Sequence, residues 1–425
     1  MFVNQPLSSC YEKRINPVKN LQLIVENDYQ TRLMQKRGLI HTARKGKLNF
    51  DKSSCIVTEP SEKSLRLLKT FLPNSRALDL FFYSIDEAET QFLQKYIPRL
   101  SHLKKLAIKA RVCNEIDDQK FTRMSRSIMK LKQLTNLSVN LVEYSEISSD
   151  SITKFFHYLT RIPYLQALSF QIFECYTLNN DAISKIIQDL KKLSLLEGLA
   201  VDFKNCYEVD DDSLISLTES FSSFNLLKAL KLHLKGCYNV TDHGVQKAGE
   251  SLSLLQNLNQ LEINFDSCFD ITEACFIQFG SFLSKLKNLQ YLKIAAIDGP
   301  QMSNQGLKAF GDTLVGLVNT KILDICLGSW QPGSTMCEEG ILNLVEVAAS
   351  LRGLETLKLH LWALRTFDDD GLLKLLTLLG SMTQLKELMI QFGKCKGITK
   401  RGVCNFQNRL KALNSGISFV DIKSN

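Results

Sequence analysis

Three features that would point to a membrane protein, a metalloprotein or an enzyme are missing from this chain of 425 residues. No run approaches the roughly 18 consecutive apolar residues of a membrane span, and no secretory signal opens the sequence. The 12 cysteines form no Cys-x-x-Cys pair. Nucleophile-elbow, phosphate-loop and zinc-helix motifs are also absent. We therefore expect no membrane span, no catalytic or metal-binding residue, no cofactor and no small-molecule substrate.

A fixed period of 31 residues organises most of the chain. Aligning on the leucine that opens a Leu-x-Leu segment gives a series of anchors at equal intervals: Leu106, Leu137, Leu168, Leu199, Leu230, Leu261, Leu292 and Leu323. Less regular gaps connect this series to Leu48 and Leu78 before it, and to Leu357, Leu388 and Val420 after it. This regularity predicts an array of stacked structural repeats.

Each unit predicts one strand followed by one helix. Apolar residues alternate from the anchor, as at Leu261, Ile263 and Phe265, which is typical of a half-buried strand. Further along most units, an apolar residue is followed at once by a residue that caps helices, namely Asp117, Ser148, Asn179, Asp210, Thr241, Thr272, Ser303, Asp368 and Thr399. The acidic runs at 210–212 and 368–370 are therefore interpreted as helix starts and not as cation sites.

Stacking explains how such units become stable, because one unit cannot bury its apolar faces alone. Helices are wider than strands, so the stack must curve. We expect an α/β solenoid, shaped like a horseshoe, of about 12 strand–helix units with parallel strands on the concave side and helices on the convex side. Residues 48–425 would form it, with irregular first units at 48–105, regular units at 106–413 and a closing edge strand at 414–425.

Seven cysteines share one register position, seven residues after the anchor: Cys55, Cys113, Cys175, Cys206, Cys237, Cys268 and Cys395. Stacked units would place them in one column beneath the strand ends, where a free Cys acts as a small buried hydrophobe with a weak donor. The column favours reduced thiols in an intracellular, cytoplasmic-type compartment over a disulfide network. No histidine column accompanies it, so we expect no zinc site there.

The turn after the cysteine carries a family resemblance. Cys237-Tyr-Asn-Val-Thr-Asp-His-Gly-Val245 is similar to the Cys-x-x-Ile-Thr-Asp-x-Gly-Leu turn of leucine-rich-repeat proteins of the cysteine-containing, ribonuclease-inhibitor-like class, and the segments beginning at Cys268 and Cys395 repeat it. The long period is most similar to expanded repeat families of single-celled eukaryotes. The resemblance implies a horseshoe fold that binds proteins. F-box substrate receptors often carry this class of repeat, but residues 1–47 show no convincing F-box pattern.

The strand residues that face the concave side are mixed in charge, which favours a protein partner over a nucleic-acid channel. Lys231 and Lys235 face acidic residues at 262 and 266 in the next unit, so their charges should partly cancel. Lys231 and Lys235 also flank His233, and we expect them to disfavour its charged form. His233 and His360 lie four repeats apart, roughly 20 Å, and cannot share a metal ion. The candidate partner-binding residues on this face and its rim are Phe173, Lys231, His233, Lys235, Asn264, Trp330, His360 and Trp362.

Only two tryptophans occur, and they belong to neighbouring units. Trp330 stands in the cysteine column, beside a three-residue insertion on the rim, whereas Trp362 is expected to face the concave side. Aromatic residues are frequent binding hot spots. The alternatives are that Trp330 packs under its own loop and that Trp362 is a lone exposed ring.

Residues 1–47 carry six of the eight net positive charges of the chain. The basic residues nearest the repeats are Arg32, Lys36, Arg37, Arg44, Lys45 and Lys47. One interpretation is a segment that docks on an acidic partner such as nucleic acid, a filament or anionic lipid. A mitochondrial presequence is disfavoured by Glu12, Glu26 and Asp28. The remaining interpretation is a basic extension that caps the open end of the array.

These observations favour a non-enzymatic scaffold for protein–protein interaction. The first alternative is an adaptor or substrate receptor of a ubiquitin ligase or of a cytoskeletal or ciliary assembly. The second is a binder of nucleic acid or an acidic filament through the basic amino-terminal segment.

Overall fold

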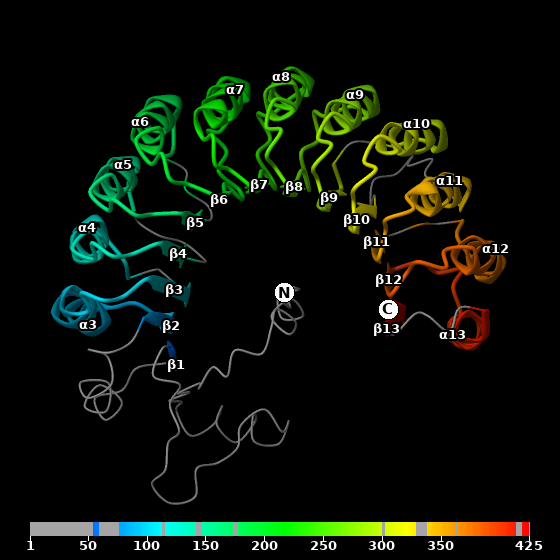
Figure 1. Ribbon diagram of the computed structural model, residues 1–425, viewed down its shortest axis with the longest axis horizontal. Coiled ribbons are helices and arrows are strands. Elements are labelled where there is room, and N and C mark those ends of the chain that lie inside the picture. Colours follow the sequence, from blue (N-terminus) through cyan, green and yellow to red (C-terminus); the bar gives the residue numbers. More distant parts are fainter. Residues whose placement is uncertain are drawn as a thin grey trace, which may run out of the picture.

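The computed structural model describes residues 54–58, 76–112, 115–141, 147–172, 175, 177–299, 302–328, 338–362, 364, 366–413 and 419–424. Strands and helices alternate along these residues. The strands line the inner side of an arc and the helices its outer side (Figure 1). The fold is therefore α/β, built from a repeated strand–helix unit.

All strands of the described residues belong to one parallel sheet of 13 strands, in which spatial order follows sequence order. They are β1 (Ser54–Thr58), β2 (Ala77–Ser84), β3 (Lys105–Val112), β4 (Asn136–Leu141), β5 (Ala167–Ile172), β6 (Gly198–Asp202), β7 (Ala229–His233), β8 (Gln260–Asn264), β9 (Tyr291–Ile297), β10 (Ile322–Gly328), β11 (Thr356–Trp362), β12 (Glu387–Gly393) and β13 (Phe419–Ser424). The expected closing edge strand corresponds to β13, which pairs with β12.

The register of the sheet confirms the anchors from Leu78 onward. Each anchor pairs with the anchor of the next unit, from Leu78 and Leu106 through to Leu388 and Val420. A slip of one residue would turn every leucine toward the hollow, so burial of one face fixes this register. The same alternation leaves every second strand residue facing the inside of the arc.

The first unit differs from the expectation. Cys55 pairs with Leu78 and therefore takes the anchor position of β1, not the cysteine position of a strand that opens at Leu48. The placement of Cys55 in the cysteine column is wrong. Leu48 and Cys113 lie outside the described residues.

The helices run along the outer side of the arc. They are α3 (Glu87–Tyr96), α4 (Asp118–Ile128), α5 (Ser149–Leu159), α6 (Asn180–Leu190), α7 (Asp211–Ser220), α8 (Asp242–Leu252), α9 (Glu273–Leu283), α10 (Asn304–Leu314), α11 (Glu338–Ser350), α12 (Asp369–Gly380) and α13 (Lys400–Leu413), with short 3-10 turns η2 (Ile97–Arg99) and η3 (Phe221–Ser223). The predicted caps are confirmed. For example, Asn179 Oδ1 accepts from the amide of Ala182 at 3.0 Å, and Thr399 Oγ1 accepts from that of Gly402 at 2.9 Å.

The acidic residue that follows the cap also accepts hydrogen bonds from the next unit. Asp242 accepts from both the amide and the hydroxyl of Thr272, each at 2.7 Å, and Asp211 holds Thr241 in the same way. A Cβ at Gly244 would overlap the Asp211 carboxylate. Each residue of the Thr-Asp-x-Gly sequence therefore has its own role. The threonine caps the helix, and the aspartate accepts hydrogen bonds from the next unit. The glycine leaves room for the aspartate of the preceding unit.

A single apolar core runs the length of the arc between strands and helices, from Leu78 to Leu410. Anchor leucines and helix residues such as Phe121, Phe276 and Phe310 are fully buried in it. Because each unit buries its apolar face only against its neighbours, the core is continuous and the inner strand face stays open to solvent.

Candidate interaction surfaces

The inner face of the arc contains the predicted concave-face residues that the structure describes. Lys231 is exposed there, whereas His233, Lys235, Asn264, His360 and Trp362 are half-buried. Phe173, Trp330 and the basic residues Arg32, Lys36, Arg37, Arg44, Lys45 and Lys47 lie outside the described residues. The six described side chains fall into two groups, one on β7, the turn after it and β8, and the other on β11.

His233 is the centre of an ionic network that crosses neighbouring strands. Its Nδ1 lies 3.1 Å from Asp202 Oδ2, and its Nε2 lies 3.2 Å from Glu262 Oε1. Glu262 also accepts from the ammonium groups of Lys231 and Lys293, each at 2.9 Å. The carboxylates of Asp202 and Glu262 are buried, with side chains only 9% and 8% exposed. Charges of both signs thus satisfy one another within the face.

The expectation that Lys231 and Lys235 disfavour the charged form of His233 is wrong. Burial does oppose the charge, but the hydrogen bonds with Asp202 and Glu262 outweigh it and raise the pKa of His233 to about 9. Burial likewise opposes ionisation of Glu262, yet His233 and the two lysines hold the pKa of its carboxyl well below the usual range. Carboxylates on neighbouring strands lie within hydrogen-bond distance of the ring, whereas the ammonium groups of Lys231 and Lys235 are themselves paired with the carboxylates of Glu262 and Asp266.

The expected cancellation of charge between the units is confirmed. Lys231 pairs with Glu262, and Lys235 Nζ lies 3.4 Å from Asp266 Oδ2. Asn264 Oδ1 accepts from the amide of Asp266 at 2.7 Å, and its Nδ2 donates to the Asp266 carboxylate at 3.3 Å. The polar groups of β7 and β8 are therefore largely committed to each other.

Trp362 is accommodated by glycines on both sides. Gly328 on β10 and Gly393 on β12 occupy its register position in the adjoining strands. A Cβ at Gly393 would overlap the indole ring, and one at Gly328 would lie 2.6 Å from the Cβ of Trp362. The indole therefore packs over the Gly393 backbone, which is the reason that Trp362 is half-buried and not a fully exposed ring.

A second surface lies on the lateral edge where each strand leads into its helix, which we call the strand-to-helix edge. Tyr207, Tyr238 and Phe269 follow the buried cysteines of three successive units and form what we call the aromatic ladder. Ring centroids of the first pair are 5.2 Å apart and those of the second 5.6 Å, with planes inclined by only 12° and 16°. Tyr238 is 43% exposed and Phe269 50% exposed.

The turn beneath the aromatic ladder explains its regular spacing. Asn205, Gly236 and Ser267, each six residues after an anchor, adopt a left-handed backbone conformation. The following thiols point inward, where Cys237 Sγ donates to the carbonyl of Phe203 at 3.2 Å and Cys268 Sγ to that of Leu234 at 3.1 Å. Burial raises the pKa of both thiols, to about 12 for Cys268. Because the cysteine side chain points inward, the side chain of the next residue points outward. The outward residues of neighbouring units are separated by one strand spacing.

The cysteine column is confirmed from Cys175 onward. Cys175, Cys206, Cys237, Cys268 and Cys395 are buried and free of disulfide bonds. Their role is local: they fill the space beneath the turn and donate weakly to backbone carbonyls.

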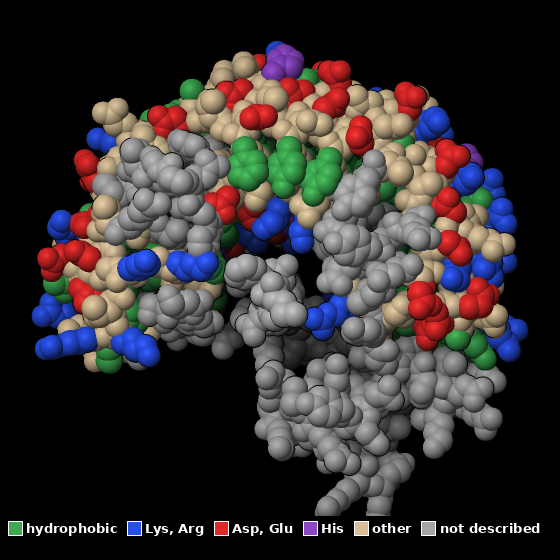
Figure 2. Space-filling model, turned by 180° about the vertical axis from the view of Figure 1, so that it is seen from behind, with side chains coloured by type: hydrophobic (Ala, Val, Ile, Leu, Met, Phe, Trp, Pro, Cys, Tyr) green, Lys and Arg blue, Asp and Glu red, His purple; other side chains and the backbone are tan. Residues whose placement is uncertain are grey.

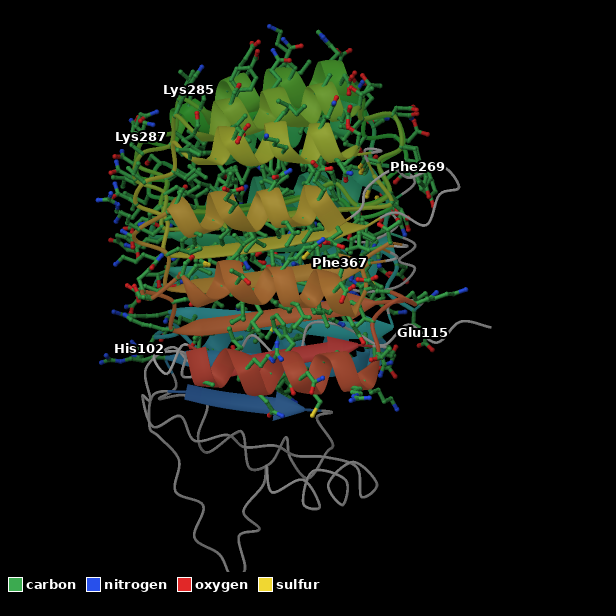
Figure 3. The ribbon with its side chains drawn as sticks, turned by 90° about the vertical axis from the view of Figure 1, so that its right-hand side faces the viewer. His102, Glu115, Phe269, Lys285, Lys287 and Phe367 are labelled. Carbon is green, nitrogen blue, oxygen red and sulfur yellow. The ribbon has the colours of Figure 1, made fainter. Side chains whose placement is uncertain are left out.

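The two lateral edges present different labelled side chains. Phe269 and Glu115 lie at one edge in Figure 3, whereas Lys285, Lys287 and His102 lie at the other. Figure 2 shows a row of hydrophobic side chains on the strand-to-helix face, with acidic side chains above it and basic side chains below it. Glu208, Asp212 and Asp270 are exposed near the aromatic ladder. Acidic residues gather here because every helix begins at this edge, where the helix dipole favours negative charge.

The sequence analysis did not identify the aromatic ladder, although a signal was present. An aromatic residue directly follows the cysteine in four consecutive units, at Tyr176, Tyr207, Tyr238 and Phe269. Tyr176 lies outside the described residues. Attention to the strand positions alone overlooked a column on the adjoining turn.

No protein-family model matches the chain, and no curated protein matches it either. In the described part of the chain, each helix is too short or too polar to cross a lipid bilayer.

Proposed function

We propose that this chain is a non-enzymatic scaffold that binds a protein partner, built as a horseshoe of about 12 units of the leucine-rich-repeat type. The parallel sheet, the buried anchors and the cysteine turn support this assignment. The folded stack already holds the backbone of many units in place, so binding costs less conformational entropy than it would for an unfolded segment. The intracellular, reducing location expected from the buried free thiols is part of the same proposal.

The observation that carries the proposal is the aromatic ladder. The stacked rings, of which Tyr238 and Phe269 are about half exposed, form a ridge that an isolated aromatic residue does not offer. Aromatic rings bring large apolar contact area at low conformational cost, and they are common binding hot spots. On the inner face, by contrast, the charges around His233 are already paired. We therefore place the main contact on the strand-to-helix edge, with the inner face beside it.

The charge of this edge defines the partner. Exposed carboxylates of Glu208, Asp212 and Asp270 flank the rings, so a polypeptide segment containing arginine or lysine would meet complementary charge. The occupant that we propose is an extended basic segment of another protein.

A selection of displayed random peptides on the full chain tests this function. We expect the selected peptides to be rich in arginine or lysine, and Tyr238→Ala to weaken their binding by more than tenfold. Tyr164→Ala is the matched control, because Tyr164 is 57% exposed but lies in a loop that leads from a helix to a strand. Peptides that bind equally to wild type and Tyr238→Ala would remove the aromatic ladder from the proposal.

The variant Trp362→Ala tests whether a partner binds at the strand-to-helix edge or on the inner face. The sequence-based hypothesis places a binding hot spot at Trp362, with a loss of more than tenfold in partner capture and a nearly unchanged melting temperature. If Trp362→Ala abolishes peptide binding while Tyr238→Ala does not, the inner face is the binding surface and the edge is not.

The charge of residues 1–47 favours a second candidate, a binder of an acidic polymer. Deletion of these residues should then abolish salt-dependent binding to single-stranded nucleic acid. Binding that survives the deletion would exclude this candidate. The adaptor role, in a ubiquitin ligase or a cytoskeletal or ciliary assembly, is a form of the first proposal and shares its tests.

A further inference from the structure

Three side chains that differ in chemistry meet on the inner face between β10 and β11. Asp324 and Cys326 come from β10, and His360 is the direct register partner of Cys326 on β11. The Asp324 carboxylate lies 3.6 Å from His360 Nε2 and 3.7 Å from Cys326 Sγ. One ligand atom from each residue lies within 4.8 Å of the other two.

We propose that Asp324, Cys326 and His360 form a binding site for Zn²⁺ or a similar borderline divalent cation. This site is independent of the partner-binding function proposed above. In a tetrahedral zinc site, bonds of roughly 2.0–2.3 Å place neighbouring ligand atoms about 3.3–3.7 Å apart. Two of the three separations already have this length. A sulfur, an imidazole nitrogen and a carboxylate oxygen together form a ligand set that suits zinc and not the hard cations Mg²⁺ or Ca²⁺.

The orientation of the imidazole supports the assignment. His360 Nδ1 lies 3.1 Å from Oε1 of Gln391, the next residue in the same row across β10, β11 and β12. An amide oxygen only accepts hydrogen bonds, so Nδ1 is the donor to Gln391, and Nε2, which faces Asp324, is the nitrogen that would give up any proton to bind a metal ion. Histidines that bind metal ions usually donate their second ring nitrogen to such an acceptor, which fixes the tautomer.

Burial and access also fit an open zinc site. The Asp324 side chain is 1% exposed, that of His360 is 19% exposed, and Cys326 is 9% exposed. The site therefore opens to the hollow on the side of His360. With three protein ligands, the fourth position would accept water or a donor atom from a bound molecule.

Two lysines lie beside the site. Lys293 and Lys358 flank Asp324 in the register of the sheet. The ammonium of Lys293 lies 2.9 Å from Glu262, a carboxylate that it shares with His233 and Lys231, so both lysines oppose the binding of a cation. A thiolate and a carboxylate together neutralise a divalent ion. As the bond from sulfur to the metal forms, the thiol proton leaves to the solvent.

Cobalt titration of the full-length protein, with a reductant that binds no metal, tests the proposal. We expect one equivalent of Co²⁺ to produce thiolate-to-cobalt charge-transfer absorption in the near ultraviolet, and Zn²⁺ to displace it. Cys326→Ser should remove that absorption. Cys404→Ser is the matched control, because Cys404 is exposed and is the more obvious place for adventitious binding.

Variants of the imidazole and its partner keep the test decisive if Cys326→Ser does not fold. His360→Gln should remove one ligand, and Gln391→Leu should lower the affinity for Co²⁺ by about 10–100-fold while the absorption at saturation persists. Zn²⁺ should raise the melting temperature of wild type but not of His360→Gln. Absence of the absorption, its loss in Cys404→Ser, or an unchanged titration in His360→Gln would each overturn the site.

Discussion

The inner face of the arc and its strand-to-helix edge both present polar and aromatic side chains, but they use their charges differently. On the inner face, Glu262 is shared by His233, Lys231 and Lys293, so a partner would have to displace internal ion pairs. At the edge, carboxylates such as Asp242 hold the next unit, while the rings of Tyr238 and Phe269 stay exposed. The comparison teaches that a surface rich in charge need not be a surface available for binding.

The largest expected difference between the two regions concerns stability. Glu262→Gln leaves His233, Lys231 and Lys293 without their shared counter-charge, and breaking a buried ion pair in this way costs about 3 kcal/mol. Asp270→Asn at the edge removes an exposed carboxylate and should change the free energy of unfolding by less than about 0.5 kcal/mol. Denaturant unfolding followed by circular dichroism measures both. Equal decreases in the free energy of unfolding of the two variants would show that the network around His233 does not stabilise the fold more than an exposed carboxylate does.

The second expected effect is a pH dependence of the free energy of unfolding that comes from His233 on the inner face. The pKa of His233 is raised to about 9 from its ordinary 6.5. The stabilisation that charged His233 gives to the folded state is therefore complete below about pH 6.5, and it is lost as the pH rises through 9. We expect the free energy of unfolding to fall by about 3 kcal/mol over this range, and His233→Gln should abolish that fall.

The matched control for this pH dependence is His243→Gln, which changes an exposed histidine at the start of α8. Its unfolding midpoints should follow those of wild type from about pH 6 to about pH 10. If wild type and His233→Gln lose stability in parallel over that range, the network does not hold His233 in its charged form.

A smaller effect separates two acidic residues of the same edge. Asp242→Ala removes two hydrogen bonds to Thr272 of the next unit, whereas Asp212→Ala removes an exposed carboxylate in the first turn of α7. Because hydrogen bonds to a charged group are worth about 1.5–3 kcal/mol, partial exposure should leave a difference of about 1–2 kcal/mol between the variants. Equal midpoints of urea unfolding would mean that the dipole effect alone explains these residues.

The smallest expected effect on stability is that of the aromatic ladder. Tyr238→Ala removes two ring contacts at the surface, which should cost about 1 kcal/mol or less. The same variant is expected to weaken peptide binding by more than tenfold, so binding and stability should separate here. A loss of stability comparable with that of Glu262→Gln would instead make the ladder a structural element.

Local periodicity predicted much of the architecture. The anchors from Leu78 onward and caps such as Asp117 and Thr272 are correct because they follow from contacts within a unit or between identical positions of neighbouring units. The prediction failed at the first unit, where Cys55 and not Leu48 aligns with the next strand. The spacing of this unit departs from the period, so alternating apolar residues gave no unique register there.

The candidate sites were harder to predict. The charge state of His233 was inferred from its neighbours on the same strand, but carboxylates on two other strands decide it. The group formed by Asp324, Cys326 and His360 was not predicted, because only the distance between His233 and His360 was considered and this group joins one histidine to two other kinds of ligand atom. The aromatic ladder was visible in the sequence, yet its exposure depends on the inward turn of the cysteine before it.

The sequence by itself determined the repeated unit, the curvature that follows from pairing wide helices with narrow strands, and the columns in which equivalent residues stack. Those properties depend on periodicity, which is local and additive along the chain. Only the tertiary structure decided which side chains of different columns meet, as His233 does with Glu262 and His360 with Asp324. Such contacts join side chains of different strands. Which neighbour a side chain contacts depends on its direction, because several candidate partners lie within a few ångströms of it.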